Sequence, residues 1–266
     1  MLTYPNIDPV LVSFGPFAIH WYGMMYLIGF LAVWWLGTMR ARKPGSGWKP
    51  EEISDMLFYG ALGVILGGRI GYVLFYNFGL FVDDPLMILR IWQGGMSFHG
   101  GMLGVFFAMW LYGRKTGRTF YQVSDVFAPY VPIGLGAGRI GNFINLELWG
   151  RPTDLPWGMV FPSVDNIPRH PSMLYEAFLE GLVLFLILWF YSAKPRARRA
   201  VSGMFMLFYG IFRFAVEFVR LPDEHIGYLA FNWVTMGHVL SAPMILFGIY
   251  LLWWAYSGRG TREAVS

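Results

Sequence analysis

Cysteine is absent from the 266 residues, which excludes disulfide bonds, thiolate metal sites and a cysteine nucleophile within this chain. Charged residues are scarce as well: they make up 14% of the chain, whereas a soluble domain averages about 25%. The five histidines form no HExxH pattern and no short-spaced pair, and there is no P-loop, dinucleotide fingerprint or GxSxG elbow. We therefore expect neither a metal nor a cofactor.

Apolar residues are abundant instead, at 56% of the chain, and the 12 Trp, 15 Tyr and 24 Phe are typical of aromatic belts at two membrane interfaces. Seven apolar stretches are candidates for membrane spans, and two of them, the third and the sixth, are short and expected to continue into polar or re-entrant structure. They cover residues 16–37, 53–77, 96–113, 122–141, 172–191, 203–220 and 235–256. This pattern predicts an all-α polytopic membrane protein with seven transmembrane helices, in a single domain over residues 1–266.

The basic residues predict the orientation of these spans. Thirteen of the twenty, including every lysine, follow spans 1, 3, 5 and 7. By the positive-inside rule that side is cytoplasmic, so the N-terminus is outside and the C-terminus inside. The net charge of +4 is explained by this distribution and does not indicate nucleic-acid binding. Because the first basic residue is Arg40, after the first span, we expect that span to be retained rather than cleaved as a signal peptide.

The other seven basic residues are all arginines, in spans or outside loops: Arg69, Arg90, Arg139, Arg151, Arg169, Arg213 and Arg220. Arginine binds phosphate or carboxylate with two parallel hydrogen bonds, which lysine does not. The pattern favours an anion that is handled from the outside. The alternative, about equally good for any single arginine but less so for all seven, is pairing with a carboxylate of the chain. The candidate carboxylates are Asp83, Asp84, Glu147, Glu176 and Glu217.

Glycine and proline mark the expected scaffold. Small-xxx-small series let helices approach closely, and we interpret the glycines of spans 2, 3 and 4 as packing positions. They are Gly63, Gly67, Gly71, Gly100, Gly104, Gly134 and Gly138. The long outside connection at about 142–171 holds five of the 16 prolines, which predicts a small irregular cap.

The run from Gly138 to Gly150, GRIGNFINLELWG, carries polar side chains into a predicted membrane boundary. A guanidinium there costs free energy unless an anion meets it, so Arg139 is a candidate binding residue. Span 6 places Tyr209, Arg213, Glu217 and Arg220 at the spacing of one helical face. Glu217 is the expected partner of Arg213, in a pair that either fixes helix register or, because the second arginine leaves surplus positive charge, belongs to an anion site.

Histidine and tyrosine are the candidates for proton transfer. His99 lies in GGMSFHGG, where glycines leave room around its ring, and histidine exchanges a proton near neutral pH. Its alternative role is an ordinary hydrogen-bonded histidine. Tyr22, beside His20 and Trp21, is equally explained as an interfacial anchor, and His238 is left without a role.

These segments together resemble one family, the prolipoprotein diacylglyceryl transferases of the bacterial inner membrane. The resemblance covers nearly the whole chain and is carried by long motifs: HWYG, GGRIGYVLFYN, GGMSFHGG, GRIGNFINLELWG, RHPSMLYE and RFAVEFVRLPD. It implies seven spans with a periplasmic N-terminus and cap, a cytoplasmic C-terminus and an active site toward the periplasm. It also implies a reaction, in which the diacylglyceryl group of phosphatidylglycerol moves to the lipobox cysteine thiol of a preprolipoprotein. A thioether forms and glycerol 1-phosphate leaves.

Carried over residue by residue, the resemblance implies a site. Arg139 resembles the phospholipid-binding arginine of the signature, and the other positions that match functional residues are Asn142, Glu147, Gly150, Tyr22, His99, Arg213, Glu217 and Arg220. Arg139 and Arg213 are expected to bind the phosphate, and His99 or, alternatively, Tyr22 to take the thiol proton. Leu146 departs from the family, which usually has glycine there, and the cap near 160–170 is short beside some relatives. The rival function is an anion or lipid transporter, although no repeated halves with broken spans are seen.

Overall fold

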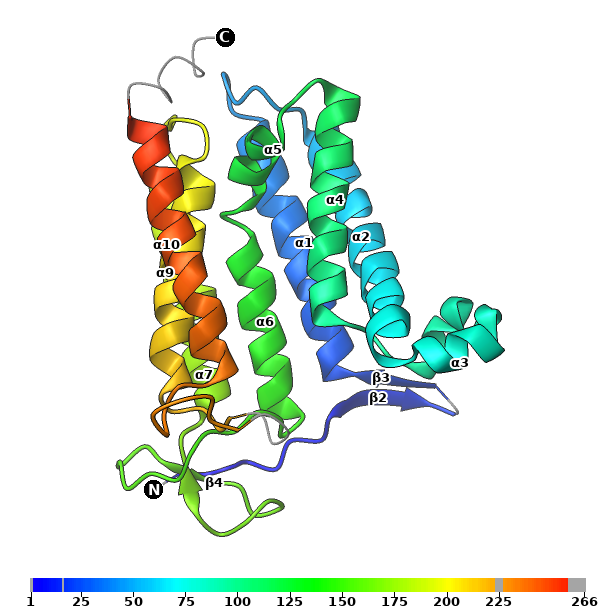
Figure 1. Ribbon diagram of the computed structural model, residues 1–266, viewed down its shortest axis with the longest axis vertical. Helices are drawn as coiled ribbons and strands as arrows, with labels where there is room; N and C mark the ends of the chain where they lie inside the picture. Colours follow the sequence, from blue (N-terminus) through cyan, green and yellow to red (C-terminus); the bar gives the residue numbers. More distant parts are fainter. Residues whose placement is uncertain (1, 16, 223–226, 258–266) are drawn as a thin grey trace. The chain divides into compact units, whose positions relative to one another are not determined.

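The computed structural model describes residues 2–15, 17–222 and 227–257, and the described chain is mostly helical (Figure 1). Arg259, Arg262 and His225, which entered the sequence interpretation, lie outside these residues, as does Asp223. The chain divides into two compact units. The first holds Met1–Val33 and Asp125–Ser266, and the second holds Trp34–Ser124.

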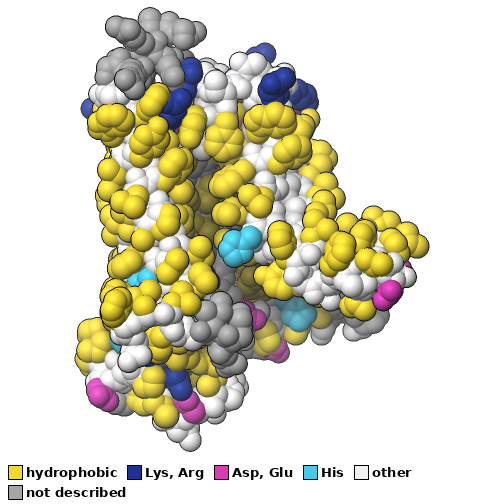
Figure 2. Space-filling model, viewed as in Figure 1, with side chains coloured by type: hydrophobic (Ala, Val, Ile, Leu, Met, Phe, Trp, Pro, Cys, Tyr) yellow, Lys and Arg dark blue, Asp and Glu magenta, His cyan; other side chains and the backbone are white. Residues whose placement is uncertain are grey.

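Within the described part of the chain, five helices are long and apolar enough to cross a membrane. They are α1 (Trp21–Ala41), α2 (Pro50–Tyr76), the continuous run of α7 (Ser172–Glu176), η3 (Ala177–Val183) and α8 (Leu184–Tyr191), α9 (Ala200–Glu217) and α10 (Met236–Tyr256). Their surfaces are apolar too. Figure 2 shows hydrophobic side chains along the visible flank of α10. Leu246, Tyr250 and Trp253 of this helix are exposed. Such a surface is costly in water and suits hydrocarbon.

The third and fourth expected spans are also helical, in shorter pieces. The third is α4 (Phe98–Thr116), and the fourth is divided into α5 (Phe120–Phe127) and α6 (Val131–Ile144). Between α5 and α6 lies Pro129, and Pro132 follows in the first turn of α6. A proline supplies no N–H to a helix and clashes with the preceding turn, so a continuous helix over 122–141 is broken here.

The all-α expectation was wrong at the N-terminus, and the cap, which was expected to be irregular, also contains short strands. Residues 17–20, expected to begin the first span, form strand β3 (Phe17–His20), which pairs antiparallel with β2 (Val10–Phe14). A second small sheet joins β1 (Leu2–Thr3), β4 (Met159–Val160) and β5 (Pro168–Arg169). Strands this short carry little hydrophobic periodicity, so the apolar run that follows them dominated the sequence pattern.

In the second unit, α2 and α4 pack along their glycines. A Cβ atom at Gly63 would lie 2.5 Å from the carbonyl oxygen of Gly104, and one at Gly71 would lie 2.8 Å from the Cα atom of Gly100. The packing role expected for these glycines is therefore confirmed. Three short helices, α3 (Phe78–Asp83), η1 (Pro85–Leu89) and η2 (Ile91–Gln93), connect α2 to α4.

In the first unit, α6 packs against the α7–η3–α8 span, and α9 packs against α10. The closest approach of the first pair is at Gly136 and Gly181, where a Cβ on Gly136 would lie 2.9 Å from the Cα of Gly181. We expected Gly138 to be a packing position as well. Among the described residues, no neighbouring atom lies within 4 Å of a Cβ atom added at Gly138, so that expectation was wrong. The helix face that approaches its neighbour passes through Gly136 instead.

The cap follows α6 and has a small hydrophobic core of its own. Tyr4, Met159, Phe161 and Met173 are buried in it, and Leu146 packs against it. The N-terminal strand β1 lies parallel to β4, and the hydroxyl of Tyr4 donates a hydrogen bond to the carbonyl of Ile144 at 2.9 Å. These contacts tie the N-terminus and the cap to the end of α6, where the predicted site begins.

Candidate functional site

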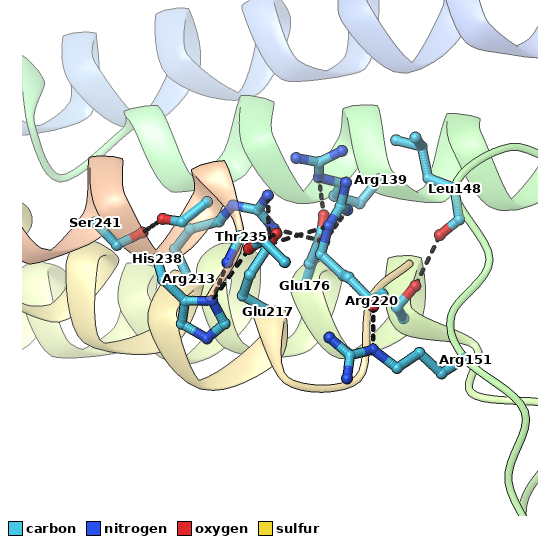
Figure 3. A network of polar contacts seen from close by, with 12 residues as sticks. Arg139, Leu148, Arg151, Glu176, Arg213, Glu217, Arg220, Thr235, His238 and Ser241 are labelled. Carbon is cyan, nitrogen blue, oxygen red and sulfur yellow. Dashed lines mark hydrogen bonds and ion pairs between the residues drawn. The ribbon is translucent and has the colours of Figure 1, made fainter. Parts of the chain in front are cut away.

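Three arginines meet two glutamates inside the first unit (Figure 3). We call this set, Arg139, Arg213, Arg220, Glu176 and Glu217, the arginine–glutamate cluster. Glu176 is at its centre, with no exposed surface, and its carboxylate contacts Arg139, Arg220 and, at 3.1 Å, Arg213. Glu217 contacts Arg213 at 2.8 Å and Arg220 at 3.3 Å. The pairing of Arg213 with Glu217 was predicted from their i, i+4 spacing and is confirmed.

The members of the cluster come from three separate parts of the chain. Arg139 is on α6, Glu176 ends α7, and Arg213 and Glu217 are on α9. Arg220 was expected on the same helix face, but α9 ends at Glu217 and Arg220 follows in the connection after it. It still reaches both carboxylates, since its backbone folds against that of Gly150 as an isolated bridge.

Asn142 and Glu147 extend the cluster through hydrogen bonds. The amide oxygen of Asn142 accepts from Arg139 at 3.3 Å, and its amide nitrogen donates to Glu147 at 2.8 Å. Asn145 donates to the other Glu147 oxygen at 3.3 Å. Asn142 has one donor face and one acceptor face and is buried, so it can link a cation to a carboxylate, which neither aspartate nor leucine can do.

Gly150 allows a close backbone approach. A Cβ at this position would lie 2.5 Å from the carbonyl oxygen of Val219 and 2.8 Å from that of His170. The Gly150 N–H donates to the His170 carbonyl at 2.8 Å, and Arg151 donates from its side chain to the Arg220 carbonyl at 2.7 Å. Any side chain here would push the cap away from the residues around Arg220. Burial, and next the charge of Arg151, lowers the pKa of His170, so this histidine stays neutral at neutral pH.

The other arginines of the spans and predicted outside loops have structural partners within the chain. Arg69 is buried and donates to the backbone carbonyls of four residues, Met87, Ile88, Gly94 and Gly95. Arg90 pairs with Asp84, and Arg169 with Asp165. The pairing of arginine with carboxylates was expected not to cover all seven, and Arg69 and Arg151 indeed bind carbonyls. The remaining candidates for anion binding among the seven arginines are therefore Arg139, Arg213 and Arg220.

Tyr22 and His99 lie in different units. The ring of Tyr22 packs against α6, where a Cβ at Gly141 would lie 2.7 Å from a ring carbon, and its hydroxyl is 3.3 Å from that of Tyr26. His99 is on the first turn of α4 in the second unit, exposed and edge-on to Phe98. The structure thus brings together the predicted site residues of the first unit. His99 is the exception, because it belongs to the second unit.

Sequence reasoning gave Glu176 too small a role. We counted it only as one of several carboxylates that arginines might pair with, whereas three arginines share it. A carboxylate within an apolar span is costly and is by default a functional position, and this signal was present for both Glu176 and Glu180. Glu180, one turn further along, is 1% exposed, and neither of its oxygens has a hydrogen-bond partner among the described residues.

The sequence indicated a substrate phosphate, rather than a carboxylate of the chain, as the partner of Arg139, and this expectation needs correction. Arg139 contacts Glu176 here. Three guanidiniums nevertheless face two carboxylates in the arginine–glutamate cluster, and their side chains are 23%, 17% and 11% exposed. The guanidiniums of the cluster present the planar donors that suit a phosphate.

Comparison with known proteins gives consistent matches over almost the full length. The family model described as prolipoprotein diacylglyceryl transferase matches residues 9–254. A Methylococcus capsulatus protein named phosphatidylglycerol–prolipoprotein diacylglyceryl transferase is 61% identical over 260 residues, covering 97% of this chain and 99% of its own length. Proteins of the same name from Pseudomonas fluorescens and Photobacterium profundum are 58% and 59% identical, covering 97% of this chain and 96% and 97% of their own lengths.

Proposed function

The chain belongs to the prolipoprotein diacylglyceryl transferase family, and on that basis we propose that it transfers the diacylglyceryl group of phosphatidylglycerol to the lipobox cysteine of a preprolipoprotein. The cysteine sulfur forms a bond to the phosphate-bearing carbon of the diacylated glycerol. The bond from that carbon to the phosphate oxygen breaks. Glycerol 1-phosphate leaves with the bonding electrons. The thiol proton goes to a base of the protein. No cysteine of the enzyme is needed, because the reacting sulfur belongs to the substrate.

The observation that carries this proposal is the convergence of Arg139, Arg213 and Arg220 on buried Glu176. A phosphate diester brings one negative charge, and a second develops on the leaving group as the carbon–oxygen bond breaks. Guanidiniums held in advance against that oxygen stabilise the transition state, and one such donor is typically worth about 3–4 kcal/mol. Glu176 holds the arginines in place until the phosphate takes over part of their hydrogen bonds.

The thiol needs a base because a free thiol has a pKa of about 8.5 and reacts as the thiolate. His99 is our candidate, with Tyr22 as the alternative. Tyr22 packs against Gly141 of α6, the residue before Asn142, and this position favours its use as an orienting group for the head group. Asn142 and Glu147 keep Arg139 directed, and Gly150 lets the cap close over the head of the lipid.

The same proposal includes the membrane arrangement. The chain is one transferase domain with seven spans in the bacterial inner membrane, its N-terminus and its cap periplasmic and its C-terminus cytoplasmic. The five long apolar helices support a multi-pass protein, and the distribution of lysine and arginine supports this orientation. Both substrates are membrane-bound, the lipid by its acyl chains and the preprolipoprotein by its signal peptide.

The test is a mass shift on a lipobox peptide incubated with purified protein and phosphatidylglycerol. Arg139→Ala should lose lipid binding and lower transfer by about a hundredfold or more, because a phosphate donor is removed. Arg90→Ala is the matched control, since Arg90 pairs with Asp84 at a partly exposed surface. His99→Gln should abolish transfer and leave lipid binding intact; a wild-type rate in this variant would remove His99 from the mechanism. Lipid movement across vesicles without peptide modification would favour the transporter.

A further inference from the structure

The first turn of α10 encloses the carboxylate of Glu217 (Figure 3). Thr235, the N-cap residue, donates its hydroxyl to Oε1 of Glu217 at 2.7 Å. The backbone of Gly237 lies so close to the same carboxylate that a Cβ atom there would overlap its carbon. Glu217 and Thr235 are 4% and 2% exposed, so water does not compete for these contacts. The carboxylate also faces the positive end of the helix dipole.

His238 holds this turn in shape from within. Its Nδ1 accepts a hydrogen bond from the backbone N–H of Thr235 at 3.2 Å, which completes a capping box. The same Nδ1 lies 3.1 Å from the hydroxyl oxygen of Thr235. The ring is 2% exposed and packs edge-on against Phe214, Phe218 and Trp233, with centroids 4.6–5.3 Å away. These contacts hold the ring of His238 in place against the first turn of α10.

Fixing Oε1 of Glu217 determines where its other oxygen points. Oε2 is the atom that contacts Nη2 of Arg213 at 2.8 Å and Nε of Arg220 at 3.3 Å. Each of these guanidiniums uses a different nitrogen, Nη1, for Glu176. The order of contacts thus runs from α10 through Glu217 to the two arginines that face the centre of the cluster.

We propose that Thr235, Gly237 and His238 are positioning residues for transfer, acting through Glu217 on Arg213 and Arg220. The inference rests on the proposed function of the cluster. Misaligned guanidiniums still attract a singly charged phosphate diester, but they stabilise poorly the second charge that develops in the transition state. Loss of positioning should therefore lower kcat more than it raises KM for phosphatidylglycerol.

The experiment compares Thr235→Val with Thr235→Ser, and His238→Leu with His238→Gln, in the full chain. Valine keeps the shape of threonine without the hydroxyl, and leucine removes the cap acceptor. We expect kcat to fall about tenfold in both, with KM within twofold of wild type. Serine restores the donor and glutamine is a usual capping-box acceptor, so both should return kcat to within about threefold. Gly237→Ala, which keeps the hydroxyl and the cap, should lower kcat similarly through its Cβ.

A second readout does not depend on transfer. Glycerol 1-phosphate, which carries the charge of the leaving group, should raise the unfolding midpoint of wild type more than that of Thr235→Val or Gly237→Ala. Wild-type kcat in Thr235→Val and Gly237→Ala would overturn the inference, as would a loss that serine and glutamine fail to restore or one confined to KM. If wild type modifies no peptide but its stabilisation by glycerol 1-phosphate is reduced in the variants, the proposed function fails and the positioning role stands.

Discussion

Replacing Glu176 by glutamine removes the one carboxylate that three arginines share. Glu176 has no exposed surface, and breaking a buried ion pair by removal of one partner costs roughly 3–5 kcal/mol. Two features reduce this figure here. Glutamine keeps a carbonyl oxygen as acceptor, and the arginine side chains are 11–23% exposed, so water screens part of the repulsion among them. We expect Glu176→Gln to lower the free energy of unfolding by about 2–3 kcal/mol.

The assay is unfolding in detergent micelles, with and without inorganic phosphate. A loss of this size corresponds to a fall of roughly 5–10 °C in midpoint for a chain of this length. Phosphate should restore more of the midpoint in Glu176→Gln than it adds to wild type, because the competing carboxylate is gone. Asp84→Asn is the matched control: it removes the same charge from the pair with Arg90, whose side chains are 36% and 46% exposed, and should cost about 0.5 kcal/mol or less.

Two outcomes would refute this reasoning. If Glu176→Gln is as stable as Asp84→Asn without phosphate, the three arginines do not depend on Glu176. If phosphate adds the same increment to wild type and to Glu176→Gln, the anion does not bind where the carboxylate holds the arginines, and the cluster is a structural ion-pair network.

Three further predictions concern the scaffold. Leu146 has a φ of +57°, which costs a non-glycine residue roughly 1–2 kcal/mol, but its side chain packs on the cap core, so Leu146→Gly should change the unfolding midpoint by only a few degrees. Gly63→Ala should sharply reduce the yield of folded protein on size-exclusion chromatography because its Cβ meets α4, whereas Gly60→Ala on the same helix meets nothing within 4 Å and should leave the yield unchanged. Arg169 hydrogen-bonds Asp165 and lowers the pKa of that carboxyl. The pair therefore stabilises the cap at pH values above the ordinary aspartate pKa, and this stabilisation is lost as the pH falls through the lowered pKa. The difference in unfolding midpoint between wild type and Asp165→Asn should be present at pH 7 and vanish as the pH falls below about 4.

The backbone conformation of Leu146 explains what its departure from the expected glycine means for the local turn. The resemblance led us to expect glycine at this position, and the effect of leucine on the local turn was left open from the sequence. Leu146 and Leu148 both adopt positive φ in the structure, at 57° and 62°. The left-handed conformation explains why glycine suits the position, and the buried contacts of Leu146 in the cap offset the strain.

The fold class and the helix positions were largely readable from the chain because they depend on local composition. In a membrane, a run of about 20 apolar residues must satisfy its backbone hydrogen bonds within a helix, whatever its neighbours are. The close packing of α2 on α4 was equally visible, since glycines four residues apart mark a face without side chains. Strands of two to five residues were not visible, because segments this short carry little periodicity of their own, and β1 in addition pairs with β4, which is distant in the sequence.

The site itself was only half determined by the sequence. Its residue types and the i, i+4 pair of Arg213 with Glu217 could be predicted, since helix spacing is a local property. Which carboxylate the arginines share could not, because Glu176 reaches Arg139 and Arg213 only after three helices pack together. Nor could the enclosure of Glu217 by the first turn of α10, which joins residues across a connection. The sequence by itself determined a membrane protein with surplus arginine. Only the tertiary structure decided which charges meet, because ion-pair geometry depends on helix packing across long separations in the chain.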